Sequence, residues 1–127
     1  ILNLLTEELE ETAFFYFRIA REYLREYMFD KSKDSYLHSL RLSFKEDYIL
    51  LQKLIFSDML LHAKKLCLDN ELISELFSEG ELISDSFSYF WYCCGKFYFD
   101  TGEINKAKEA ALTALIIKPV TGAGAPS

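Results

Sequence analysis

Residues that interrupt helices are scarce in this chain of 127 residues. It contains only five glycines and two prolines, and both prolines lie near the C-terminal end. Half of the residues are hydrophobic and 16% are aromatic, a composition that argues against intrinsic disorder. A chain of this length is long enough to bury a core as one domain. We therefore predict a single, nearly all-helical domain.

Long apolar runs and a basic surface are also absent. No apolar run approaches the roughly 18 residues that a membrane-spanning helix needs, so we predict no membrane span. Acidic residues outnumber basic residues by 20 to 14, and the net charge is −6. A nucleic-acid partner would require a basic surface, so we predict no nucleic-acid binding.

Metal-binding residues are few. The chain has three cysteines and two histidines, which do not make up a zinc-binding set, and we predict no metal and no cofactor. Cys93 and Cys94 are adjacent, a geometry that disfavours a bridge between them. Unpaired thiols indicate a reducing compartment, so we predict a cytoplasmic location. Because the chain starts at Ile1 and not at Met, we expect a fragment or a processed form.

Apolar spacing and capping residues divide the chain into helices. Asp47 is expected to cap the third helix, Asp69 and Asn70 to begin the fourth, Gly80 to end it, and Pro119 to end the last. The sequence "FDKSKD" is expected to separate the first two helices. The predicted helices cover residues 6–29, 32–44, 48–68, 71–80, 86–99 and 103–118.

One stretch near the C-terminal end carries a recognisable motif, W-x2-C-G-x2-Y followed by a turn, two small positions and a proline. Its residues are Trp91, Cys94, Gly95, Tyr98, Gly102, Ala107, Ala114, Leu115 and Pro119. This pattern resembles one tetratricopeptide repeat, a helix–turn–helix unit of 34 residues, over residues 88–121. Cys94 stands where the family usually has leucine, and Ala111 stands where it usually has a large aromatic residue.

A second stretch, residues 13–46, is similar to the same repeat but matches it less closely. It has the aromatic, aliphatic, small and aromatic spacing of the first helix and the small and aromatic positions of the second, with Phe44 in place of the terminal proline. The matching residues are Tyr16, Ile19, Ala20, Tyr23, Ser32, Tyr36, Ser39 and Leu40. A middle helix pair fits between the two units, although its register stays open.

The resemblance implies an all-α fold of antiparallel helix pairs, stacked as a right-handed superhelix of about three pairs with six or seven helices. The repeat domain would cover residues 1–119, and residues 120–127 would be a flexible tail or linker. Within this pattern, Trp91 and the adjacent cysteines of "FWYCCGKFYFDTG" are expected to serve packing.

The resemblance also implies a protein-interaction module that binds a partner segment in a concave groove lined by the first helix of each pair. Arg18, Arg21 and Arg25 form a basic stripe with aromatic neighbours, which suits an acidic or C-terminal peptide segment. The same arginines could instead pair with Glu11 and Glu22. The predicted partner-binding residues are Phe14, Phe17, Arg18, Arg21, Arg25, Tyr89, Tyr92, Cys93, Lys96 and Phe99.

Two alternatives stay open. The chain could be a structural assembly element that packs its apolar faces against neighbours, and a homo-oligomer fits that reading. No catalytic constellation is present in the sequence, so we predict that the chain is not an enzyme. An unusually acidic cysteine thiol would reopen that possibility.

Overall fold

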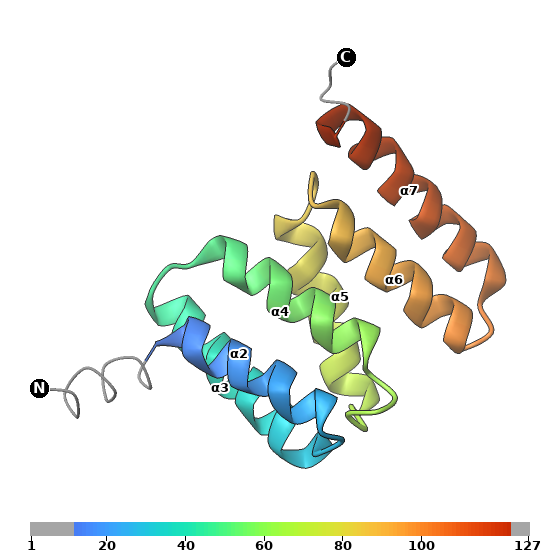
Figure 1. Cartoon of the computed structure of the whole chain (residues 1–127). Helices are drawn as coiled ribbons and strands as arrows, with labels where there is room; N and C mark the ends of the chain where they lie inside the picture. The colour runs from blue at the N-terminus through green and yellow to red at the C-terminus, as the bar shows by residue number, and fades with distance from the viewer. Residues whose placement is uncertain (1–11, 123–127) are drawn as a thin grey trace, which may run out of the picture. The chain divides into compact units, whose positions relative to one another are not determined.

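The structure, a computed structural model, describes residues 12–122 and contains six α-helices and no strand in that range. The prediction of an all-α chain is confirmed. The helices pack in adjacent pairs, and the numbering follows Figure 1. Their bounds are α2 (Ala13–Arg25), α3 (Phe29–Lys45), α4 (Ile49–Leu61), α5 (Asn70–Ile83), α6 (Ser88–Asp100) and α7 (Ile104–Gly122).

The chain forms two compact units, and the boundary between them falls within α4 after Ile55. The first unit contains the α2–α3 hairpin, and the second contains α5, α6 and α7. The expected start of the first helix at Thr6, with its acidic first turn, lies outside the described residues. Residues 123–127 of the predicted tail lie outside them as well.

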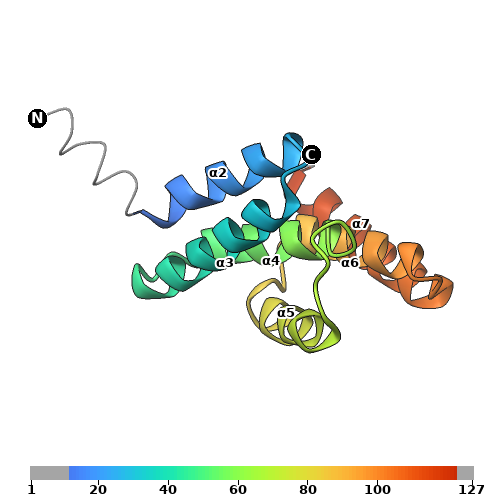
Figure 2. The same ribbon diagram turned by 90° about the horizontal axis from the view of Figure 1, so that it is seen from below.

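In the first unit, α2 and α3 lie side by side (Figures 1 and 2). The buried face of α2 presents Ala13, Phe17 and Ala20, whose spacing of four and three places them on one side of the helix. The hydroxyl of Ser39 donates to the carbonyl of Ala13 (2.6 Å), and that of Ser32 donates to the carbonyl of Ala20 (2.8 Å). Both serines are fully buried, so small residues and two hydrogen bonds hold the hairpin closed.

One type of turn recurs at four positions in the chain. In each, one residue has a left-handed φ and the N–H of the following residue bonds to the carbonyl five positions earlier, at 2.8–3.1 Å. Asp47 is one of these residues, so the prediction that it caps the next helix is wrong, because it instead ends α3. The left-handed residues are Tyr27 (φ 62°), Asp47 (57°), Cys67 (54°) and Gly102 (85°).

Three other predicted helix ends are wrong. "FDKSKD" belongs to the first turns of α3, which begins at Phe29 because the left-handed turn at Tyr27 supplies the break. Gly80 lies within α5, where its missing side chain makes room for the ring of Phe90. Pro119 lies within α7, which continues to Gly122; a proline there removes only one backbone donor near the end of the helix. The cap at Asp69 is confirmed, since its carboxylate accepts from the N–H of Leu72 (2.8 Å).

In the second unit, α6 packs on α5 and α7. The ring of Phe77 on α5 stacks on Tyr98 with ring centroids 5.2 Å apart, and the Trp91 Nε1–H donates to the carbonyl of Ser84 (2.9 Å). On the other side, Gly95 faces α7, where an added Cβ would lie 3.4 Å from the carbonyl oxygen of Ala107. Cys93 and Cys94 are buried in this packing, as predicted, and neither is part of a disulfide.

Candidate functional site

A groove of about 600 Å³ lies between α6 and α7 in the second unit. Tyr89 and Tyr92 lie on the α6 side with nearly parallel rings whose centroids are 6.5 Å apart. The α7 side is formed by small and aliphatic residues, so most of the lining is apolar. The lining residues are Ser88, Tyr89, Tyr92, Lys96, Ala111, Ala114 and Leu115.

Tyr89 is a fixed part of this groove. Its hydroxyl donates to Oδ1 of Asp58 on α4 (2.9 Å), and Asp58 is only 2% exposed. Burial, followed by the Asp58 carboxylate and the Cys93 thiol, raises the pKa of Tyr89 well above its ordinary value. The phenol therefore stays protonated at neutral pH, donates its hydrogen and holds its ring in place.

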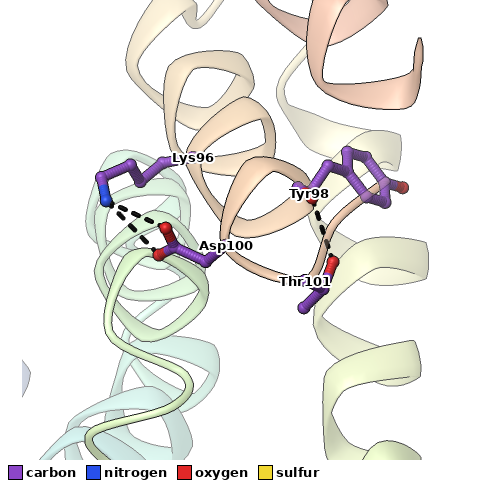
Figure 3. Close-up of polar contacts among 4 residues, drawn as sticks. All are labelled: Lys96, Tyr98, Asp100 and Thr101. Carbon is purple, nitrogen blue, oxygen red and sulfur yellow. Dashed lines mark hydrogen bonds and ion pairs between the residues drawn. The ribbon is translucent and has the colours of Figure 1, made fainter. Parts of the chain in front are cut away.

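Lys96 supplies the groove's cationic side chain. Its ammonium lies 3.1 Å from Oδ1 and 3.4 Å from Oδ2 of Asp100, one helical turn further along α6 (Figure 3). Both side chains are substantially exposed, so the pair is held only weakly. An incoming carboxylate could therefore compete with Asp100 for the Lys96 ammonium.

A second, smaller cavity of about 340 Å³ lies on α2 in the first unit. Phe14, Phe15 and Ile19 form its apolar part, and Arg18 and Glu22 lie among them. The Arg18 guanidinium carbon is 5.9 Å from the centroid of the Phe14 ring, which is 46% exposed. Arg18 therefore presents a positive charge beside an accessible aromatic face.

The other residues predicted on α2 have different surroundings. Phe17 is 3% exposed and packs edge-on to Tyr36, so its ring belongs to the core. The Arg21 guanidinium carbon lies 4.5 Å from the centroid of that ring. Arg25 is paired with Glu22 at 2.8 Å, which is the alternative pairing that the sequence left open.

The structure thus brings together some of the predicted residues within each unit. Tyr89, Tyr92 and Lys96 line one groove, and Phe14 and Arg18 line one cavity. Cys93 is buried, and Phe99 is 62% exposed but does not line the groove. The sequence-based prediction did not include the residues of α7 that line the groove. A signal for them was available, because alanine and leucine residues recur at spacings of three and four along that helix.

No group of three or more His, Cys, Asp and Glu side chains among residues 12–122 could hold a metal ion. No helix in the part of the chain that the structure describes is both long and apolar enough to cross a bilayer. Burial raises the pKa of the Cys94 thiol, with further contributions from Cys93 and Glu81, so this thiol is less acidic than an ordinary cysteine.

No family model, no curated protein and no solved structure matches the chain.

Proposed function

We propose that the chain is a helical-repeat module, similar to tetratricopeptide repeats, that binds a segment of a partner protein. The bounds of the helix pairs support the repeat assignment, since α2–α3 and α6–α7 coincide within one residue with the units 13–46 and 88–121. The packing of Gly95 against α7 and the left-handed turn at Gly102 fall at the small and turn positions of the motif. Stacking of the pairs as a right-handed superhelix is part of this proposal.

The observation that carries the binding role is the apolar groove between α6 and α7. Its volume and its two parallel tyrosine rings suit the insertion of an aliphatic or aromatic side chain, the kind of anchor that dominates binding energy in protein interfaces. The hydrogen bond from Tyr89 to Asp58 fixes one ring before binding, which lowers the entropic cost of association. Lys96 would favour a segment with a carboxylate close to that anchor.

The α2 surface supports an acidic partner segment. Arg18 and Arg21 are both exposed, and each guanidinium lies over an aromatic ring. This arrangement pre-orients two positive charges on one helical face. Reversing Arg18 to Glu should weaken binding of an acidic segment, whereas Lys108→Glu, the same charge reversal at an exposed position of the second unit, should have little effect.

The experiment selects binding peptides on the wild-type chain from a displayed library and measures their affinity for groove variants. Tyr92→Ala or Leu115→Ala should weaken binding about tenfold or more, because each removes a wall of the groove. Leu82→Ala is the matched control, since Leu82 is an exposed leucine of the same unit that does not line the groove. Failure to enrich any peptide, or equal affinity of all variants, would contradict the proposal.

One observation favours a second candidate, an assembly element that packs permanently against a neighbour. Leu112, Leu115 and Ile116 on α7 are 59–68% exposed, and their spacing of three and four places them on one helical face. Light scattering distinguishes the two functions. A permanent assembly predicts association of the wild-type chain that Leu112→Lys with Ile116→Lys abolishes, whereas a peptide-binding module stays monomeric in both forms.

A further inference from the structure

A third cavity, of about 250 Å³, lies in the second unit where α5, α6 and α7 meet. Phe77, Trp91 and Tyr98 provide aromatic walls, and Glu81 and Glu109 provide carboxylates. It does not share a lining residue with the α6–α7 groove. Figure 3 shows why, since Lys96 of the groove and Tyr98 of this cavity project from opposite sides of α6.

The aromatic walls are held in place by contacts with the rest of the unit. The Trp91 Nε1–H donates to the carbonyl of Ser84, and the rings of Phe77 and Tyr98 are stacked with an interplanar angle of 19°. These contacts fix the orientation of the rings. The stack uses one face of Phe77 and one face of Tyr98, so a cation would approach the other ring faces. The cavity therefore offers oriented π-faces, which attract cations.

The carboxylates make the cavity negative. Neither Glu81 nor Glu109 has an ion-pair partner among the residues that the structure describes. Burial, the Cys94 thiol and the carboxylates of Glu81, Glu103 and Glu109 together raise the pKa of Tyr98, as expected where negative charge gathers around a phenol. A cation in this cavity would find two carboxylates that no described side chain neutralises.

Lys106 shows that a cation fits against these walls. Its ammonium lies 5.6 Å from the centroid of the Tyr98 ring and 3.2 Å from Oε1 of Glu103. The Lys106 side chain is 61% exposed, so this contact is weak and can be exchanged for another. Lys106 would then act as an internal competitor that an incoming cation displaces from the Tyr98 ring.

We propose that this cavity binds the guanidinium of an arginine side chain from a partner protein. A guanidinium is planar, stacks on aromatic faces and donates to carboxylates in a fork, so one group can use both kinds of wall. The cavity is smaller than those that enclose drug-sized ligands, which suits a single side chain. The cavity does not depend on the α6–α7 groove. Through it, this acidic chain would recognise a basic segment of a partner protein.

The test uses Trp91, the only tryptophan of the chain, as a fluorescent reporter inside the cavity. The whole chain is titrated with the peptide N-acetyl-Gly-Arg-Gly-amide and with the same peptide carrying citrulline, which has the shape of arginine but no charge. We expect a saturable fluorescence change with arginine, at a dissociation constant on the order of 1 mM, and a several-fold weaker response with citrulline.

Variants assign the binding to the cavity. Glu81→Gln and Glu109→Gln should each weaken arginine binding roughly three- to tenfold, and Lys106→Met should strengthen it roughly two- to fivefold by removing the competitor. Glu79→Gln changes the net charge equally but does not line the cavity, so it should leave the affinity unchanged. Far-ultraviolet circular dichroism confirms that each variant keeps its helices.

Three results would overturn the proposal. Equal affinity for the arginine and citrulline peptides would exclude recognition of charge. Unchanged affinity in the double variant Glu81→Gln with Glu109→Gln would exclude the cavity. Equal or tighter binding of a lysine peptide would exclude a guanidinium-specific site. The α6–α7 groove variants Tyr92→Ala and Leu115→Ala should not affect this titration. A negative result for the arginine peptide therefore does not contradict the groove proposal.

Discussion

Gly80 and Gly95 both lie within helices, but a methyl group would meet different surroundings at each. At Gly80, an added Cβ would clash with two ring atoms of Phe90. Phe90 is fully buried and packs edge-on to Trp91, so its ring would have to move against packed neighbours. At Gly95 the nearest atom is 3.4 Å away, which is an ordinary contact.

Gly80→Ala should therefore destabilise the chain. Overpacking of the core lowers the free energy of unfolding by about 1–3 kcal/mol. The better helix propensity of alanine raises it by only up to about 1 kcal/mol. Chemical denaturation should show a lower free energy of unfolding for Gly80→Ala, while Gly95→Ala, the same substitution one helix further, should match or exceed the wild type. A Gly80→Ala variant as stable as Gly95→Ala would show that Phe90 can shift.

Tyr89 makes a second prediction at the residue scale. Tyr89→Phe keeps the ring but removes the donor to the buried Asp58 carboxylate, which should cost about 1–3 kcal/mol of unfolding free energy. Tyr92→Phe is the control, because Tyr92 is exposed and no described hydrogen bond joins its hydroxyl to another residue. Equal stability of the two variants in urea denaturation would contradict the structural role of the Tyr89 hydroxyl.

At the scale of the elements, the left-handed turns decide where helices end. A non-glycine residue in this conformation costs roughly 1–2 kcal/mol, because Cβ approaches the following carbonyl oxygen. Asp47 takes this conformation at φ 57° with an exposed side chain. The cost is offset by the hydrogen bonds of the turn, such as that from the N–H of Tyr48 to the carbonyl of Ser43 (2.8 Å).

Asp47→Gly should stabilise the chain by up to about 1 kcal/mol, since glycine adopts the left-handed region freely but loses more backbone entropy on folding. The thermal midpoint should rise. Gly102→Ala tests the reverse change at φ 85°, where no atom crowds an added Cβ, so only the backbone strain should lower the midpoint. If Asp47→Gly lowered the midpoint instead, the Asp47 side chain would have to make a stabilising contact.

For the whole molecule, three buried or half-buried groups predict a loss of stability at alkaline pH. Folding raises the pKa of Cys94 above its ordinary 9.0 and the pKa values of Tyr89 and Tyr98 above their ordinary 10.0. The unfolded chain therefore releases these protons first. Their contribution to stability is complete below the ordinary values and is lost progressively as the pH rises toward the folded values.

The free energy of unfolding should thus be level around neutral pH and fall from about pH 9 upward. Urea denaturation at a series of pH values measures this slope. Cys94→Ala should be less stable at neutral pH, because it loses a buried side chain, but its curve should fall less steeply between about pH 9 and 10. A curve that ran parallel to the wild type in that range would mean that Cys94 does not titrate differently in the two states.

Sequence and structure agree on some of the local features of this chain. The scarcity of glycine and proline determined that it is helical, and the caps and spacing placed Asp69, α6 and the turn at Gly102 correctly. These features depend on neighbours within a few residues, so a single sequence contains the information they need. The same is true of the buried Cys94, whereas Cys93, which the resemblance also placed among the partner-binding residues, is buried instead.

The tertiary structure alone decided the features that depend on contacts between distant residues. Gly80 resembles a helix end in sequence, but the ring of Phe90, which follows it by ten residues, makes it a packing position within α5. Asp47 resembles a cap, yet the hydrogen bonds that end α3 hold it in a left-handed conformation. The α7 wall of the groove and the carboxylate–aromatic cavity each join side chains from separate helices. Their proximity follows from how the helices pack, which spacing along one helix does not specify.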